Sequence, residues 1–389
     1  MSQKHLDSLY IHRFRGLRDL ELSNLGQINL LVGINNCGKT SVLEAINIYS
    51  HPLDIREWAS TATLREGSIP SSFGIYIDGF FTQDVLSLNE EDLTKKISIS
   101  STGQYFLNKL DITRELIEKS WGEDLEDSGF STSDTTEFGN DSLVSENTEA
   151  VKRGIFLQAS INHHYDGSGN PLFVNIENSE SWEIWQDRNY LPKPSRLGKT
   201  IKLPTSIVTL TSHAKRQESL LSQAKISGLD KLALKLIQQI DEDILDIQIL
   251  VGNSRSSSYY LSIKHRKFAT LVPVTFFGDG VRRLFHIALK LADAKDGILL
   301  IDEIEATIHT EAIQDTFEWI AKWAKELNVQ VFATTHSLEA VDAMIDAADS
   351  ASDLVLYRLE PTEAKTRVVR HDWERLKRLR ENLGQEVRW

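Results

Sequence analysis

The residues with the clearest chemical meaning lie in one short stretch, residues 28–41 (INLLVGINNCGKTS). The pattern G-x-x-x-x-G-K-[ST] is filled there by Gly33, Gly38, Lys39 and Thr40. In this pattern the backbone N–H groups of the loop surround phosphate oxygens, the lysine reaches the β- and γ-phosphates, and the hydroxyl ligates Mg²⁺. The stretch therefore predicts a phosphate loop (residues 33–40) that binds a nucleoside triphosphate.

The residues around this loop have the composition of a strand and a helix. An apolar run at residues 28–32 precedes the first glycine, and apolar residues recur at helical spacing over residues 42–46. A strand before the loop and a helix after it distinguish a phosphate site from a chance glycine turn. We expect the nucleotide to contact the other positions of the loop as well, which are Asn35, Asn36, Cys37 and Ser41.

Polar residues follow two further apolar runs later in the chain. Asp302 and Glu303 come directly after residues 297–301, and His336 comes shortly after residues 329–333. Because buried parallel strands end at one edge of a sheet, we expect these side chains beside the phosphate loop. Asp302 would hold Mg²⁺, and Glu303 would polarise the attacking water as a general base. His336 would hydrogen-bond the γ-phosphate and detect its loss.

The composition limits the class of protein. Hydrophobic content of 41% and charged content of 25% are globular values, and a net charge of −13 argues against a broad basic surface for DNA. A single cysteine, Cys37, excludes an intramolecular disulfide and a multi-cysteine zinc site. Neither an apolar run long enough to span a membrane nor a signal peptide is apparent, so we expect a cytoplasmic protein without membrane contact.

Three regions are predicted. Residues 1–115 would form the first half of an α/β nucleotide-binding head, and residues 271–389 the second half. Residues 116–270 would be an insert that contains an acidic mobile loop and a helical arm at residues 219–250, where leucines and isoleucines recur at three- and four-residue steps. Short alternating runs between residues 73 and 112 predict an antiparallel sheet.

The N-terminal residues I-H-R-F-R-G-L and L-V-G-I-N-N-C-G-K-T, together with D-E-I-E-A-T-I-H at residues 302–309, resemble a known family. They are similar to the ABC-type AAA-family ATPases related to the OLD proteins, within the wider RecF and SMC group. The resemblance departs from the family pattern at Thr307, which replaces a glycine. It implies an α/β fold with an ABC-type P-loop ATPase head, an antiparallel β subsheet and an inserted helical and strand region.

The resemblance also implies cofactors and further site residues. ATP and Mg²⁺ would bind, and Gln83 would complete the magnesium shell. The sequence GDGVRR at residues 278–283 resembles the ABC signature motif, with Gly278 in place of its serine. In the family this turn completes the γ-phosphate site of the opposite subunit, so Gly278 and Gly280 would contact nucleotide in a homodimer or higher homo-oligomer. Arg282 and Arg283 would hold phosphate or an interface, or else form an exposed first helical turn.

Three functions remain open at this stage. Too few residues follow His336 for a Toprim nuclease domain, so the resemblance favours a stand-alone ATPase that controls a separately encoded effector, such as a nuclease, in bacterial anti-phage defence. The alternative is a RecF-like repair ATPase that binds DNA directly, and a nucleic-acid contact is compatible with both. A transporter ATPase subunit is a third class, which the strand-rich insert and the D-E-I-E-x-x-x-H string argue against.

Cys37 lies inside the phosphate loop, where it has two interpretations. It is either a tolerated variable position or a reactive thiol. A helix N-terminus and a neighbouring lysine lower the pKa of a thiol, so the second interpretation predicts a reactive thiolate that bound ATP protects.

Overall fold

The computed structural model of the 389-residue chain describes residues 4–64, 80, 96–120, 151–165, 171–185, 196–210, 217–239, 241–251, 259–348, 353–362 and 365–388. Gln83 and almost all of the predicted acidic loop at residues 122–151 lie outside these ranges. Within them, none of the helices has the length and apolar character needed to cross a lipid bilayer.

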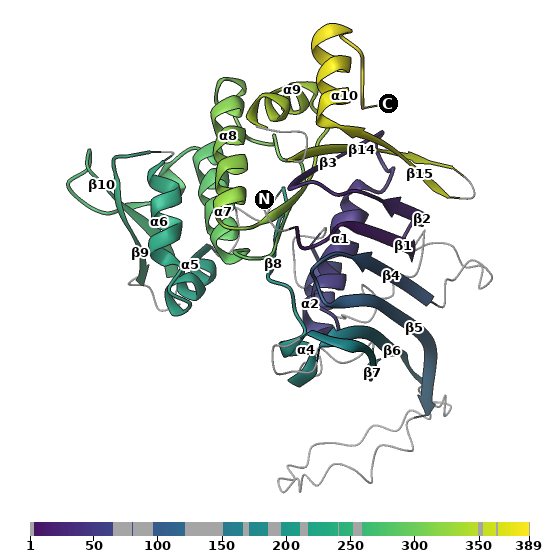
Figure 1. The fold of residues 1–389 in the computed structure, drawn as a ribbon. Helices are drawn as coiled ribbons and strands as arrows, with labels where there is room; N and C mark the ends of the chain where they lie inside the picture. The colour runs from purple at the N-terminus through teal and green to yellow at the C-terminus, as the bar shows by residue number, and fades with distance from the viewer. Residues whose placement is uncertain are drawn as a thin grey trace, which may run out of the picture.

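A mixed sheet forms the centre of the molecule (Figure 1), with the strand order β15-β14-β3-β13-β12-β8. All of its neighbouring strands run parallel except β14 and β15. Every residue of β3, β12 and β13 is buried, as expected of parallel strands that are covered on both faces. The strands are β3 Ile28–Val32, β8 Thr205–Val208, β12 Ile298–Ile301, β13 Gln330–Thr334, β14 Leu354–Pro361 and β15 Thr366–Asp372.

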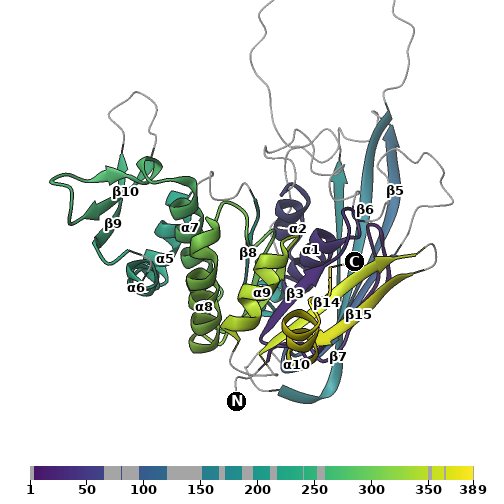
Figure 2. The ribbon, with the colours of Figure 1, turned by 90° about the horizontal axis from the view of Figure 1, so that it is seen from above.

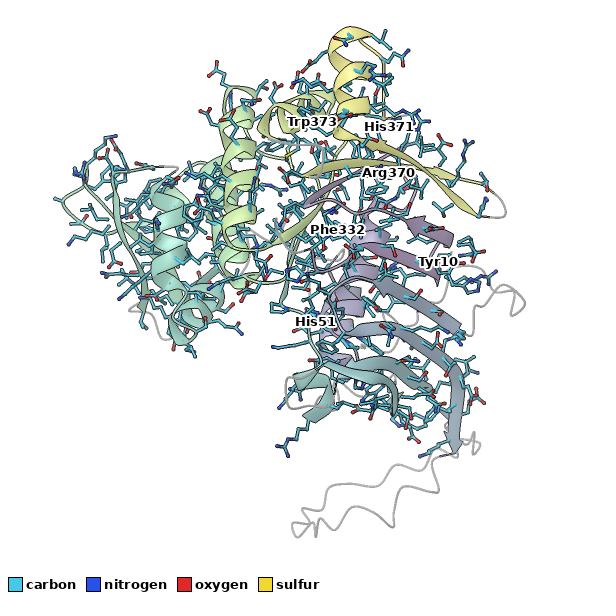
Figure 3. All side chains as sticks on the ribbon, in the orientation of Figure 1. Tyr10, His51, Phe332, Arg370, His371 and Trp373 are labelled. Carbon is cyan, nitrogen blue, oxygen red and sulfur yellow. The ribbon has the colours of Figure 1, made fainter. Side chains whose placement is uncertain are left out.

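The two faces of the central sheet enter different cores. Leu30 and Val32 of β3 pack in the core formed with α7, α8 and α9, whereas Leu31 packs in the core formed with α1. This alternation follows from the two-residue period of a strand. Phe332 of β13, labelled in Figure 3, belongs to the α1 core. These helices are α1 Lys39–Ser50, α2 Ile55–Ala62, α7 Asp279–Asp293, α8 Thr310–Glu326 and α9 Leu338–Ala347.

A second, antiparallel sheet lies beyond α1, on the side opposite to α7 and α8 (Figure 2). Its order is β2-β1-β4-β5-β6-β7, and the predicted α/β class with an antiparallel subsheet is thereby confirmed. Its strands are β1 Ser8–Phe14, β2 Leu17–Leu22, β4 Lys96–Thr102, β5 Leu107–Ser120, β6 Val151–Tyr165 and β7 Pro171–Trp185.

The predicted helical arm at residues 219–250 is wrong in its second half. α5 Gln217–Ile226 is followed by Gly228, whose φ of +73° interrupts the helix, and α6 Asp230–Gln238 comes next. β9 Ile244–Val251 is a strand and pairs with β10 Tyr259–His265, which in turn pairs with β11 Val272–Pro273. The alternating ILDIQILV sequence fits a half-buried strand better than a helix.

The predicted three-part division of the chain stays a prediction. The segment 116–270 contributes β6 and β7 to the antiparallel sheet and β8 to the edge of the central sheet. The remaining described elements are α4 Arg196–Thr200, the 3₁₀ turn Val274–Phe276, α10 Trp373–Lys377 and the π-helical turn Arg378–Asn382.

Candidate active site

The phosphate loop joins β3 to α1 and has the backbone conformation that its glycines permit. Gly33 has φ +145° and Gly38, which caps α1, has φ +98°, so both lie in the region that L side chains rarely adopt. A Cβ on Gly33 would lie 2.7 Å from Cys37 Sγ. Asn36 has φ +62°, a conformation that asparagine tolerates better than most residues. The loop is therefore closely specified by its residue types.

Lys39 is the first residue of α1 and lies almost wholly within the loop, with 6% of its surface exposed. Its Nζ donates to the carbonyl oxygens of Gly33 at 2.9 Å and Ile34 at 3.0 Å. The loop thus holds a buried ammonium group at its centre. A phosphate that enters the loop would compete with these carbonyls for the ammonium protons.

A cluster of hydroxyl and carboxylate groups joins α1, β12 and β13. Thr40 Oγ1 donates to the two carboxylate oxygens of Asp302 at 3.1 and 3.2 Å, and Thr334 Oγ1 donates to the same carboxylate at 2.7 Å. The backbone N–H of Glu303 donates to Thr334 Oγ1 at 2.8 Å. Thr40 and Asp302 place hard oxygen donors side by side, and such a set suits Mg²⁺. Residues 262 positions apart in the chain thus meet as predicted.

Glu303 follows β12 in a left-handed backbone conformation, with φ +50°. Arg283 of α7 holds this peptide in place, because its Nη2 donates to the carbonyl oxygens of Asp302 at 2.9 Å and Glu303 at 2.6 Å. The Arg283 side chain is fully buried. Burial lowers the pKa of Arg283, while the charges of Glu305, Glu303 and Asp302 act in the opposite direction. A buried guanidinium therefore fixes the backbone beside the candidate base.

His336 follows β13 and is half-buried. Its backbone N–H donates to Glu305 Oε1 at 2.9 Å, so the segments after β12 and β13 are joined directly. Asp302, Glu303 and His336 thus lie at the carboxyl ends of neighbouring parallel strands, next to the strand that leads into the phosphate loop. This is the edge of an α/β sheet at which ligands bind.

A family model described as an AAA ATPase domain matches residues 5–341. The chain belongs to this family. It is an ATPase. A relative from Helicobacter pylori (strain ATCC 700392 / 26695), named ATP/GTP phosphatase, is 22% identical over 371 residues, which are 91% of this chain and 92% of the relative.

Two further similarities are more limited. The DNA replication and repair protein RecF of Xanthomonas oryzae pv. oryzae (strain MAFF 311018) is 27% identical over 107 residues, 28% of this ATPase and 28% of RecF. A solved SMC head bound to the C-terminal winged-helix domain of ScpA is 14% identical, with a TM-score of 0.47, and the match covers 95% of this chain and 99% of that one.

The signature-like turn of this ATPase lies close to the acidic segment of its own chain. Gly278 caps the N-terminus of α7, as the glycine-rich turn predicts, and a Cβ there would meet no atom of the described residues within 4 Å. A Cβ on Gly280 would lie 2.9 Å from the carbonyl oxygen of Thr307, so glycine permits this close approach. Thr307 itself has φ +63°, at the position where the related pattern has a glycine.

Sequence reasoning missed the role of Arg283 and left two interpretations of Cys37 open. Arg283 is neither an exposed first-turn residue nor part of the phosphate loop. The sequence indication of its buried role was a charged residue among the apolar residues of a helix. Of the two interpretations of Cys37, the structure contradicts the reactive thiolate of lowered pKa. Its side chain is 3% exposed, and burial raises the pKa of the thiol although Lys39 acts to lower it. Desolvation is the larger effect here.

Proposed function

We propose that this ATPase is a nucleotide-driven switch whose hydrolytic site is the edge formed by the phosphate loop and the ends of β12 and β13. The contact of Thr40 with Asp302 carries the proposal, because it brings a motif hydroxyl onto the carboxylate that follows a buried parallel strand. Phosphoryl transfer generally requires that charge is neutralised and that the nucleophile is positioned, and both requirements would be met at this edge.

Each residue has a separate role in the proposal. Lys39 neutralises phosphate charge, and Asn35, Asn36, Cys37, Gly38 and Ser41 line the phosphates together with Gly33. Thr40 and Asp302 would hold Mg²⁺, with Gln83 as a further predicted member of that shell; when bound, the ion neutralises charge between the β- and γ-phosphates. Glu303 accepts a proton from the attacking water, and His336 hydrogen-bonds the γ-phosphate.

The hydrolytic roles are tested by separating binding from turnover. Lys39→Ala removes the ammonium and should weaken ATP binding, whereas Glu303→Gln keeps the shape of the side chain and should bind ATP without hydrolysing it. Equilibrium nucleotide binding and phosphate release are measured on both variants. Parental turnover in Glu303→Gln would exclude Glu303 as the base.

The switch is proposed to close as a homodimer or higher homo-oligomer around nucleotide. The open position of Gly278 supports a contact between this turn and the nucleotide of a second copy, since an added Cβ would touch nothing within 4 Å in the part of the chain that the structure describes. The N–H groups at the start of α7 would then face the γ-phosphate.

The output of the switch is proposed to be a separately encoded cytoplasmic effector, such as a nuclease, in anti-phage defence. The resemblance of residues 302–309 to the ATPases related to the OLD proteins supports this part of the proposal. Pull-down of the products of neighbouring genes with Glu303→Gln and Mg-ATP tests it, because the ATP-bound state should persist in this variant. Lys39→Ala serves as the nucleotide-free control.

A RecF-like DNA-binding ATPase is the second candidate, and the similarity to RecF over 107 residues favours it. Direct DNA binding by the purified protein should then appear without any partner and should weaken steeply as salt rises. The effector proposal instead predicts partner binding that depends on nucleotide and not on DNA.

A further inference from the structure

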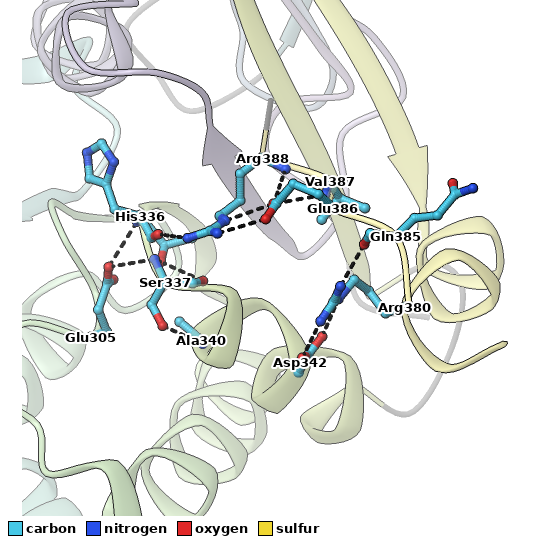
Figure 4. Close-up of polar contacts among 11 residues, drawn as sticks. Glu305, His336, Ser337, Ala340, Asp342, Arg380, Gln385, Glu386, Val387 and Arg388 are labelled. Atoms are coloured by element: carbon cyan, nitrogen blue, oxygen red, sulfur yellow. Dashed lines mark hydrogen bonds and ion pairs between the residues drawn. The ribbon is translucent and has the colours of Figure 1, made fainter. Parts of the chain in front are cut away.

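The peptide of His336 is held from two sides by side chains of opposite charge (Figure 4). On one side, Glu305 Oε1 accepts the backbone N–H groups of His336 at 2.9 Å and Ser337 at 3.1 Å. On the other side, Arg388 Nη1 donates to the carbonyl oxygen of His336 at 2.6 Å. We call this arrangement the His336 clamp.

Residues 335–337 lie between β13 and α9. The Thr335 N–H still donates to the Leu31 carbonyl, and the Ser337 carbonyl accepts the N–H of Val341 in α9. The N–H groups of His336 and Ser337 and the His336 carbonyl are instead held by side chains. Ser337 caps α9 through its Oγ, which accepts the N–H of Ala340 at 3.1 Å. The clamp therefore supplies hydrogen bonds that a strand-to-helix junction lacks. The charge of Glu305 also lies at the positive end of the α9 dipole.

Glu305 connects His336 to the candidate base, which is two residues earlier in the chain. The segment between them is fixed at Ile304, whose N–H donates to the carbonyl oxygen of Thr334 at 3.0 Å. Movement of Glu303 or of His336 relative to the other would therefore strain or break the Glu305 contacts. The clamp thus couples the residue that would activate water to the residue that would contact the γ-phosphate.

Arg388 is held rigidly by its own neighbours. Glu386 pairs with its guanidinium at 2.7 Å and accepts the backbone N–H groups of Val387 and Arg388 at 3.0 and 2.9 Å. These contacts lower the pKa of Glu386 to about 2, with the Arg388 side chain as the main cause, so Glu386 is ionised at neutral pH. Val387 is 1% exposed and lies in the core that α9 also enters.

The segment that carries Arg388 is also fixed to α9 at a second point. Arg380 forms a two-point ion pair with Asp342 of α9 at 2.7 and 2.8 Å, and its Nη1 donates to the carbonyl oxygen of Gln385 at 2.6 Å. Bidentate pairs of this kind impose geometry as well as energy. Residues 380–388 therefore lie on α9 in a defined position, with Arg388 directed at His336.

We propose that Glu305 and Arg388 are positioning residues that set the orientation of His336 for ATP hydrolysis. This inference depends on the proposed contact of His336 with the γ-phosphate. It adds that docking of residues 380–388 onto α9 adjusts turnover without contributing to nucleotide binding. A merely structural role as a helix cap would instead alter stability while leaving hydrolysis by the folded protein unchanged.

The first test removes Arg388 and compares it with a matched arginine. Arg388→Ala should lower kcat by about ten-fold or more, as expected when a catalytic group is misplaced, with KM for ATP changed by less than about two-fold. Arg378→Ala removes the same charge from an exposed position just before residues 380–388 and should leave kcat unchanged. Equal effects of the two substitutions would overturn the proposal.

The second test asks whether Arg388 acts through His336. In a His336→Ala background, Arg388→Ala should cause no further loss of kcat, because the group that it positions is absent. Independent losses that multiply in the double variant would overturn the positioning role. Unchanged turnover in His336→Ala alone would instead refute the proposed role of His336, and the inference about hydrolysis would fall with it.

The third test observes the clamp without ATP hydrolysis. Glu305→Ala removes the acceptor of the His336 and Ser337 amides, so hydrogen exchange in a peptide that spans residues 335–340 should accelerate. Exchange in peptides from β6 serves as the control for global unfolding. Unchanged exchange at residues 335–340 would overturn the clamp itself.

Discussion

The hydrogen bonds of Arg283 to the carbonyl oxygens of Asp302 and Glu303 lead to a quantitative prediction. Arg283→Met keeps an unbranched side chain in the same buried position but removes both of these hydrogen bonds. A hydrogen bond that involves a charged group contributes about 1.5–3 kcal/mol, and the desolvation that lowers the pKa of Arg283 offsets part of it. We therefore expect the free energy of unfolding to fall by about 2–4 kcal/mol.

The effect on catalysis should exceed what this loss of stability explains. Glu303 has φ +50°, a conformation that costs a residue other than glycine about 1–2 kcal/mol and is retained only while its surroundings hold it. Without Arg283 the peptide can relax to negative φ, which moves the Glu303 carboxylate away from the water that we propose it activates. A displacement of about 1 Å lowers turnover by about 10²-fold, while ATP binding through Lys39 should persist.

The assay measures kcat and KM by phosphate release at a temperature where the variant is folded, and stability by urea unfolding. Arg114→Met is the matched control, since Arg114 is also buried, at 6% exposed, but lies on β5 of the antiparallel sheet. It should lose stability and keep kcat. Arg283→Lys should recover part of the turnover, because an ammonium can still donate to one carbonyl. A destabilised Arg283→Met protein with parental kcat would refute the role of Arg283 in holding the base.

Two further predictions concern assembly and pH. Gly278→Trp should block hydrolysis by obstructing the second copy. Mixing this variant with Lys39→Ala should restore activity, because one intact site forms in each mixed dimer. Full turnover by a strictly monomeric parent protein, checked by light scattering, would rule out this arrangement. Burial lowers the pKa of His371 from 6.5 to about 4. As pH falls, the imidazole therefore takes up a proton in the unfolded chain before it does so in the folded one. The free energy of unfolding should consequently drop by about 2 kcal/mol between pH 7 and pH 5. Urea unfolding of His371→Leu should lack this part of the acid sensitivity, and an identical pH dependence would contradict the assignment.

The parts of the site that could be predicted from the sequence are those encoded locally. The strand, glycine loop and helix around Lys39 are contiguous, and Asp302 and His336 each follow a short apolar run that is typical of a buried strand. Parallel pairing then brings the ends of these runs together without any further information. The contact of Thr40 with Asp302 is the result.

The errors arose where a local sequence pattern carries no information about the residues that pack against it in the folded chain. One of the two interpretations of Cys37 took the charge of Lys39 to lower the thiol pKa, but the sequence does not show that packing removes the thiol from water. Residues 244–251 contain enough leucine and isoleucine to satisfy a helical spacing as well as an alternating one, and their pairing with β10 decides for the strand. Burial and strand pairing are properties of the folded chain, so neither could be obtained from residue spacing alone.

The contacts that hold the backbone of the candidate site could not be found from motifs, because each joins a side chain to a main-chain atom far away in the chain. Arg283 and Glu305 bind peptide groups that every residue type possesses, so the bound positions carry no sequence pattern. Arg388 contacts His336 across 52 positions by the same means. The left-handed conformations of Glu303 and Thr307 lie in the segment that these side chains surround. Strained backbone persists only where neighbouring contacts over-determine it, which is why hydrolysis should respond to residues that touch neither nucleotide nor metal.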